Sequence, residues 1–109
     1  MEELIDPGGS RARLEEVFDA TGEPVLKVSG ELDLSNVGSI RTAIEATVGR
    51  AVDRIVFDLS ELRFMDSSGL AMLLAVAERV RTLELRRPPE TVRRVIELTG
   101  LASAFVISD

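Results

Sequence analysis

The 109-residue sequence contains no cysteine and no histidine. Without cysteine, the chain cannot form disulfides, thiolate nucleophiles or cysteine-based zinc sites. Without histidine, it lacks the commonest general base and the commonest transition-metal ligand, and a Ser-His-Asp triad is impossible. We therefore expect no catalytic residue, no metal site and no cofactor, and we do not expect the protein to be an enzyme.

Aromatic residues and basic charge are also scarce. The chain has no tryptophan or tyrosine and only four phenylalanines, which disfavours a stacking platform for single-stranded nucleic acid. Its formal net charge of -6 disfavours binding to a phosphate backbone. The sequence also lacks the two common glycine-rich nucleotide motifs, G-x-x-x-x-G-K-[ST] and G-x-G-x-x-G. We therefore expect no nucleic-acid partner.

Long apolar runs are absent as well. No run reaches the roughly 18 apolar residues that a membrane-spanning helix needs. The first ten residues are acidic and lack the apolar core of a signal peptide. We therefore expect a cytoplasmic protein that does not insert into a membrane.

The length and composition predict one globular domain. Hydrophobic residues make up 45% of the chain and charged residues 29%, which is typical of a soluble domain. The chain is long enough for one hydrophobic core and too short for two. Because Pro7, Gly8 and Gly9 interrupt the start of the chain, we expect a flexible N-terminal segment over residues 1–10 and a domain over residues 11–109.

The first regular pattern predicts a β-hairpin. Residues 13–20 alternate weakly between apolar and polar, and their charges suit an exposed edge strand. Residues 25–29 alternate again after a glycine-containing turn at residues 21–24. Two short strands joined by such a turn are typical of an antiparallel pair.

A helix is predicted next. Apolar residues recur at helical spacing from Val37, and Gly49 is expected to end the helix. Ser35 is a credible N-cap, and Asp33 or Asn36 could share that role.

The second half of the chain predicts two more strand–helix pairs and a last strand. The first pair is a buried strand over residues 54–59 and a helix from residues 67–68, whose apolar stripe is Leu70, Leu73, Leu74, Ala77 and Val80. The second pair is a strand over residues 83–85 and a helix from Pro88-Pro89 with a C-terminal cap at Gly100. The last strand is expected over residues 104–107. The order ββαβαβαβ predicts an α/β domain. Its sheet would be mixed and mostly parallel, with about five strands, a hairpin at one edge and three or more helices.

One join is unusual. Residues 81–83 would have to turn a helix into a strand without glycine, asparagine or proline. Because loops of this kind usually have about 2–6 residues, either the helix ends early, near Ala77, or loop residues are missing from the sequence.

The sequence Asp66-Ser67-Ser68-Gly69 is expected at an exposed apex where the chain passes from the sheet into a helix. One interpretation is structural, because serines at a helix N-terminus commonly act as caps. The other is functional, since free backbone N–H groups and the helix dipole would favour an anion there. A phosphate on Ser67 would add about -1.5 to -2 charge units beside Asp66 and disrupt contact with an acidic partner surface.

Two further carboxylates are expected near this apex. Glu31 and Asp33 end the second strand of the hairpin, and in a parallel sheet that end shares a rim with Ser67. They could form a polar turn that caps a helix, or join Asp66 in acid–base chemistry or metal binding, although no spacing here is diagnostic. Phe64 and Met65 are expected to pack in the core or at the apex.

Together these motifs resemble the STAS domain, and in detail the bacterial anti-sigma factor antagonists. The resemblance covers roughly residues 12–107. The segments that carry it are Gly30-Glu31-Leu32-Asp33, the block Phe64-Met65-Asp66-Ser67-Ser68-Gly69-Leu70 with the preceding strand, and Pro89 through Thr99-Gly100-Leu101.

The resemblance implies a partner-switching protein. The unphosphorylated antagonist would bind an anti-sigma factor that is a serine kinase, and so free the sigma factor. The kinase would phosphorylate Ser67, and a PP2C-type phosphatase would remove the phosphate. Partner binding would involve Glu31, Asp33, Asp66, Ser67, Ser68 and Gly69.

A second function stays open at this point. A STAS domain can also serve as a regulatory or structural subunit of a lipid-transporting ABC complex, with no phosphoswitch. In either case we expect a monomer by default.

Overall fold

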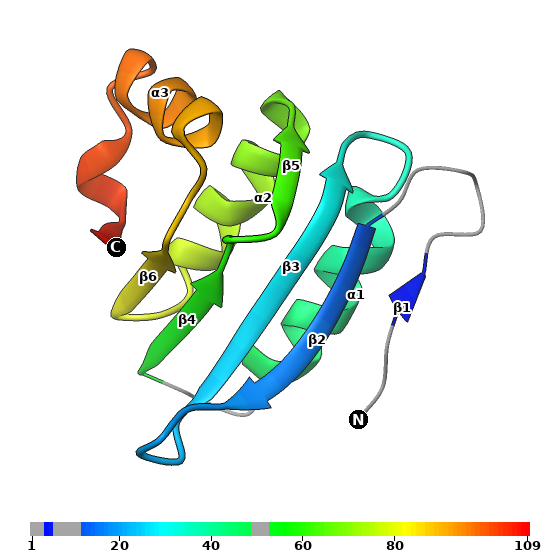
Figure 1. The fold of residues 1–109 in the computed structure, drawn as a ribbon, viewed down its shortest axis with the longest axis vertical. Coiled ribbons are helices and arrows are strands. Elements are labelled where there is room, and N and C mark those ends of the chain that lie inside the picture. The colour runs from blue at the N-terminus through cyan, green and yellow to red at the C-terminus, as the bar shows by residue number, and fades with distance from the viewer. Residues whose placement is uncertain (1–3, 6–11, 49–52) are drawn as a thin grey trace.

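The protein is built on a mixed β-sheet with helices packed against it (Figure 1). The computed structural model describes residues 4–5, 12–48 and 53–109. Over these residues the strands are β1 (Leu4–Ile5), β2 (Ala12–Phe18), β3 (Pro24–Leu32), β4 (Arg54–Asp58), β5 (Leu62–Met65), β6 (Thr82–Arg86) and β7 (Val106–Ser108). The helices are α1 (Val37–Val48), α2 (Ser67–Ala77), α3 (Glu90–Leu98) and the short 3-10 helix η1 (Ala102–Ala104).

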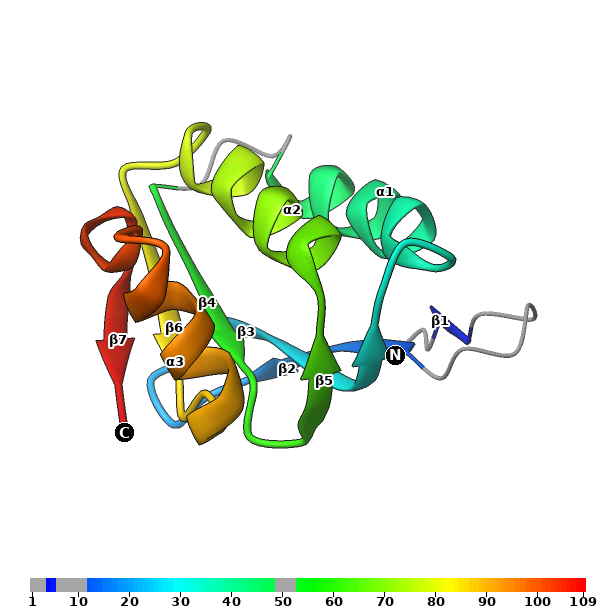
Figure 2. The ribbon, with the colours of Figure 1, turned by 90° about the horizontal axis from the view of Figure 1, so that it is seen from above.

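The sheet topology confirms the expected α/β class. Strands β2 and β3 form the antiparallel hairpin, and β3, β4, β6 and β7 follow as parallel neighbours. The strand order is β1-β2-β3-β4-β6-β7, with β5 paired to β3 beside this path. Helices α1 and α2 lie together on one face of the sheet (Figure 2).

The sheet is larger than the sequence predicts, with seven strands over the described residues instead of about five. Strand β1 pairs with β2, so the expectation that residues 13–20 form the edge is wrong. Of the ten residues expected to be a flexible lead-in, the structure describes only Leu4–Ile5; the other eight lie outside the described residues, as does Gly49. Strand β5 was not predicted from the sequence, because its four residues are too few for a clear periodicity.

The link between α2 and β6 is resolved by an early helix end. Helix α2 stops at Ala77, and the backbone N–H of Glu78 donates to the Leu74 carbonyl. Four residues then lead to β6, and the backbone N–H groups of Arg81 and Thr82 both donate to the Asp53 carbonyl. The first of the two alternatives is therefore confirmed, and no special turn residue is needed.

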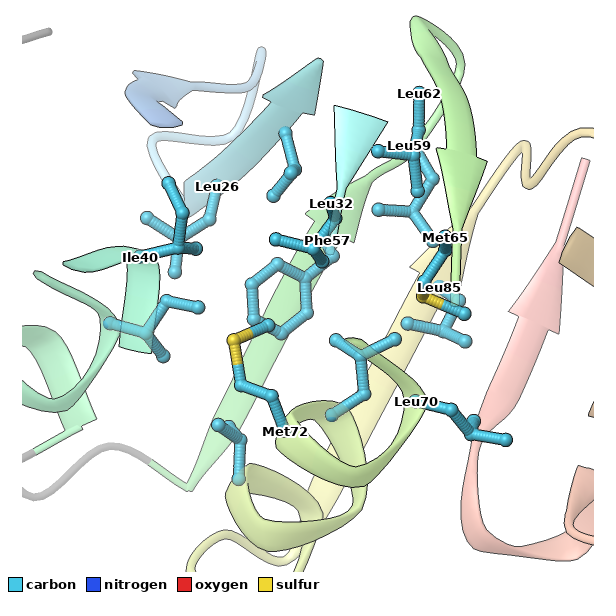
Figure 3. Packing of buried hydrophobic residues seen from close by; sticks show 14 of the residues in the cluster. Leu26, Leu32, Ile40, Phe57, Leu59, Leu62, Met65, Leu70, Met72 and Leu85 are labelled. Atoms are coloured by element: carbon cyan, nitrogen blue, oxygen red, sulfur yellow. The ribbon is translucent and has the colours of Figure 1, made fainter. Parts of the chain in front are cut away.

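The core lies between the sheet and the two helices α1 and α2. Phe57 of β4 is fully buried, and Met72 of α2 points into the same cluster (Figure 3). Met72 and Val76 were not in the expected stripe of α2, whereas Leu74 and Ala77, which were, are only partly buried. The buried arc differs because α2 packs against α1 as well as the sheet.

The opposite face of the sheet carries both apolar and charged side chains. By strand alternation it carries the cross-strand row Val25, Val56 and Glu84, which lies outside the core cluster. Glu84 is buried, and it accepts hydrogen bonds from the Ser108 hydroxyl (2.7 Å), from Arg86 Nε (3.1 Å) and from Arg54. Burial raises the pKa of Glu84, but these partners outweigh it and hold the pKa below its usual range.

Helix α3 confirms the terminal signals in the sequence. Pro89 occupies the N-cap position, one residue before the helix begins. At the other end Gly100 has φ +74°, and the backbone N–H of Leu101 donates to the Ile96 carbonyl at 3.2 Å. This is the left-handed glycine cap that was expected.

Candidate functional site

Two segments meet at the carboxyl ends of β3 and β5. These strands are parallel neighbours in which Leu32 pairs with Met65, and the backbone N–H of Asp66 donates to the Leu32 carbonyl at 3.2 Å. The next residues, Asp33 and Asp66, therefore leave the sheet at the same end, where the β3–α1 loop lies beside the start of α2 (Figures 1 and 2). The expectation that Asp33 and Ser67 share one rim is confirmed.

Asp66 is the N-cap of α2. One carboxylate oxygen accepts the backbone N–H of Ser68 at 2.9 Å and of Gly69 at 3.3 Å, and the Ser68 hydroxyl donates to the same oxygen. The Ser68 hydroxyl is the main cause that lowers the pKa of Asp66. The interpretation of the two serines as caps is therefore wrong, because the preceding aspartate fills that position. These two N–H groups are also not free to receive another anion.

Ser67 and Ser68 differ in exposure and in hydrogen bonding. Ser67 is exposed, and its hydroxyl makes no hydrogen bond to any other residue that the structure describes. The Ser68 side chain is half-buried and held by Asp66. Ser67 is therefore the more accessible hydroxyl of the pair.

This arrangement predicts a pH-dependent cap. We expect Asp66→Ala to lower the free energy of unfolding at pH 7 by about 1 kcal/mol, the usual loss for a removed N-cap. Because folding lowers the pKa of Asp66, its contribution is present above the ordinary carboxyl pKa and is lost as pH falls through the folded-state value.

Urea unfolding of the wild type and Asp66→Ala at pH 7 and at about pH 3 tests this. The difference in free energy between the two proteins should shrink at the lower pH, where the aspartate is protonating. Ser67→Ala, next to it in the same helical turn, is the matched control and should stay within about 0.5 kcal/mol of wild type. A difference that is the same at both pH values would contradict the role of the ionised cap.

The β3–α1 turn is held by Asp33 and Asn36. The Asp33 carboxylate accepts the backbone N–H of Ser35 at 3.0 Å and its hydroxyl at 2.7 Å. Asn36 is buried, donates from Nδ2 to the Glu31 carbonyl at 2.8 Å, and accepts the backbone N–H of Asp33 at 3.1 Å. Of the three residues proposed as caps, Asn36 directly precedes Val37, and its side-chain hydrogen bonds join the turn to the end of β3.

Glu31 and Gly69 occupy different environments in this region. Glu31 is half-buried, and its carboxylate lies 3.7 Å from Arg63 Nη2. Gly69 is buried, and a Cβ atom at this position would lie 2.5 Å from Met65 Cγ and 3.1 Å from Leu32 Cδ2. Gly69 thus allows the start of α2 to approach the ends of β3 and β5 closely.

Two exposed apolar side chains flank the apex and were not identified from the sequence. Leu34, between Asp33 and Ser35, is 78% exposed, and Phe64, two residues before Asp66, is 50% exposed. Met65 is buried in the core, and Phe64 lies exposed two residues before Asp66, so the core is excluded for Phe64 and the apex placement is left. For Leu34, an apolar residue within a polar turn was the available signal.

The carboxylates do not form a recognisable ligand cage. Among the described residues, no group of three or more acidic side chains is placed so that it could hold a metal ion. Within the same part of the chain, no helix has both the length and the apolar character needed to cross a membrane.

Comparison with known proteins first gives the class of the protein. Residues 17–107 match a family model described as "Mlab, STAS domain". Two curated relatives are similar over most of the chain. The anti-sigma F factor antagonist of Lysinibacillus sphaericus is 38% identical over 85 residues, covering 71% of this chain and 70% of the relative. The anti-sigma-F factor antagonist RsfB of Mycobacterium tuberculosis is 33% identical over 92 residues, covering 82% and 75%.

Solved structures agree with this class. An anti-sigma factor antagonist from Mycobacterium paratuberculosis matches with a TM-score of 0.77 and 31% identity, covering 96% of this chain and 90% of that chain. The Bacillus protein SpoIIAA matches in its phosphorylated form with a TM-score of 0.67 and 27% identity, covering 88% and 91%. In its unphosphorylated form SpoIIAA gives a TM-score of 0.72 and 28% identity, covering 88% of both chains. The chain belongs to the STAS domain family, among the anti-sigma factor antagonists.

Proposed function

We propose that this antagonist is a protein-binding switch and not an enzyme. In its unphosphorylated form it binds an anti-sigma factor that is a serine kinase, which releases the sigma factor. The observation that carries the proposal is the Ser67 hydroxyl, exposed and unengaged among the described residues, at the rim where β3 and β5 end. The structures of the relative SpoIIAA in two phosphorylation states support it.

The surface around Ser67 supplies the rest of the contact. Side chains or backbone of Glu31, Asp33, Asp66, Ser68 and Gly69 lie on the two segments that meet there, and we assign partner binding to this surface. Its carboxylates give it a negative potential, which can orient a basic partner during association.

Phosphorylation of Ser67 switches this contact off. A phosphoserine carries about -1.5 to -2 charge units at pH 7. The first-turn N–H groups of Ser68 and Gly69 already bind Asp66, so they cannot neutralise the phosphate. The added charge stays at the surface beside Asp66, where repulsion and the cost of desolvating it oppose binding. We expect the domain to stay folded after phosphorylation, because the Ser67 hydroxyl makes no hydrogen bond to another described residue.

The same proposal places the protein in the cytoplasm as a monomer, where a PP2C-type phosphatase reverses the modification. An exposed phosphoserine that is not held by the helix N-terminus would be accessible to such an enzyme.

Phosphorylation mapping tests the proposal. After incubation with ATP and candidate anti-sigma kinases, we expect intact mass to increase by one phosphate and fragment spectra to place it on Ser67. Ser67→Ala should take up none, whereas Ser68→Ala, the matched neighbour, should still be modified at Ser67. Phosphate on Ser68, or no phosphate from kinases that modify another substrate in the same assay, would refute the switch.

A second candidate is a STAS subunit of a lipid-transporting ABC complex. The matching family model is named for Mlab as well as for the STAS domain, which keeps this function open. It predicts stable copurification with a transport ATPase that Ser67→Ala does not alter. Phosphorylation at Ser67 together with failure to copurify would exclude it.

A further inference from the structure

One side of the end of β3 is held by a side chain. Asn36 is only 1% exposed, and both ends of its amide group form hydrogen bonds. Its Nδ2 donates to the Glu31 carbonyl at 2.8 Å, and its Oδ1 accepts the backbone N–H of Asp33 at 3.1 Å. A residue of a parallel neighbouring strand bonds two alternate residues in the same way. Among the described residues, the pairing of β2 with β3 ends at Gly30, so the Asn36 amide continues the pairing beyond that point.

The same segment of chain is joined to the start of α2. The backbone N–H of Asp66 donates at 3.2 Å to the carbonyl of Leu32, the residue between the two that Asn36 holds. The Ser68 hydroxyl is the main cause of the low pKa of Asp66, and the backbone N–H of Leu34 adds to it. Because successive backbone groups of a strand point to opposite neighbours, Asn36 and Asp66 hold alternate residues of this segment from opposite sides.

We propose that Asn36 is a positioning residue for Ser67. Asn36 fixes the end of β3, which holds Asp66 through the Leu32 carbonyl. Asp66 in turn is the N-cap of α2, and Ser67 lies in the first turn of that helix. The inference rests on the proposed function, in which a kinase must align the Ser67 hydroxyl with the phosphate that it transfers. A displacement of about 1 Å in such an arrangement can cost on the order of 100-fold in rate.

Removing the Asn36 amide would leave two backbone groups without their partner. The Glu31 carbonyl and the Asp33 N–H would then have to find water or shift, because an unpaired backbone group shielded from water is unfavourable. The Leu32 carbonyl lies between them and would move with them, which weakens its bond to Asp66. The bonds from Asp66 to the first turn of α2 do not involve Asn36, so the helix itself should persist.

Hydrogen exchange of single amides tests this link without a kinase. In the wild type, the N–H groups of Asp33 and Asp66 should have protection factors within about threefold of each other, because they open together. Asn36→Ala should speed exchange at Asp66 by about tenfold. Thr82, whose N–H donates to the Asp53 carbonyl at the opposite end of the sheet, should change by less than about twofold. Asn36→Asp keeps the side-chain size and removes only the Nδ2 donor, so it should act in the same direction.

Steady-state phosphorylation by the anti-sigma kinase tests the consequence for Ser67. We expect both Asn36 variants to lower kcat by about tenfold or more and to keep KM within about threefold, because the hydroxyl is misplaced after binding. Ile55→Val is the matched control. It removes one buried methyl group near the start of β4, and it should lower stability without changing kcat or exchange at Asp66. A purely structural role for Asn36 predicts that its variants behave like this control.

The outcomes separate this inference from the function on which it rests. Unchanged exchange at Asp66 in both Asn36 variants would overturn the inference and leave the proposed function standing. Faster exchange at Asp66 with an unchanged kcat would also overturn it, since the link would not reach Ser67. A wild type that no active anti-sigma kinase phosphorylates would overturn both. If circular dichroism shows that the variants do not fold, wild-type protection factors of Asp33 and Asp66 that differ by more than about tenfold would overturn the inference.

Discussion

Replacing Ser67 by aspartate is expected to weaken binding to the anti-sigma kinase by about 100-fold, or about 2.7 kcal/mol. The substitution places a charge beside Asp66 in the contact surface, where like-charge juxtaposition and desolvation cost several kcal/mol. Because aspartate carries less charge than phosphoserine, this value is a lower bound for phosphorylation. Titration calorimetry with purified kinase and nucleotide measures it.

Two control variants separate the effect of losing the Ser67 hydroxyl from the effect of adding a negative charge. Ser67→Ala should bind within about threefold of wild type, since the hydroxyl makes no hydrogen bond to another described residue. Ser103→Asp adds the same charge at an exposed residue of η1, next to β7, and should leave the affinity unchanged. Equal affinities of Ser67→Ala and Ser67→Asp would contradict a switch by charge at this position. If Ser103→Asp weakened binding as much, net charge would be the cause.

The second large effect is expected at Gly69. Gly69→Ala should lower the free energy of unfolding by about 1–2 kcal/mol. The new methyl group would lie 2.5 Å from Met65 Cγ and within 3.2 Å of Leu32 Cδ2 and Met65 Sδ, so the packing must shift. Overpacking of this kind costs about 1–3 kcal/mol, and the better helix propensity of alanine returns at most about 1 kcal/mol.

Gly38→Ala provides the matched control with the opposite sign. Gly38 is the second residue of α1, Gly69 the third of α2, and a Cβ atom on Gly38 would meet nothing within 4 Å. This variant should gain up to about 1 kcal/mol, because alanine loses less backbone entropy than glycine on folding. Urea unfolding of the two variants measures both values. Stabilisation of the protein by Gly69→Ala would show that α2 can move away from β5 at little cost.

The two predictions address different properties of the same apex. Ser67→Asp changes affinity without a change in folding, whereas Gly69→Ala changes the fold beneath the contact surface. If Gly69→Ala also weakens binding, we expect the cause to be a displacement of α2. Ser67→Asp should weaken binding without that displacement, so its circular dichroism spectrum should match that of the wild type. Comparing the variants therefore distinguishes loss of contact by charge from loss of contact by distortion.

Sequence by itself determined the features that rest on local chemistry and short spacing. The hairpin followed from alternation across a glycine turn, and the cap at Gly100 followed from a residue that tolerates positive φ. The shared rim of Asp33 and Ser67 followed from parallel strands, whose carboxyl ends meet at one edge. The Asp66-Ser67-Ser68-Gly69 block was also visible, since its residue types occur together at a helix start.

Only the tertiary structure decided how these groups share their bonds and their exposure. Asp66 takes the N-cap and engages Ser68, which leaves Ser67 accessible; sequence cannot assign this because all three side chains are capable caps. Leu34 and Phe64 are exposed although they are apolar. Glu84 is buried although it is charged, because partners from β4, β6 and β7 bind its carboxylate. Burial depends on what the neighbouring strands and helices cover, and those neighbours are distant in the chain.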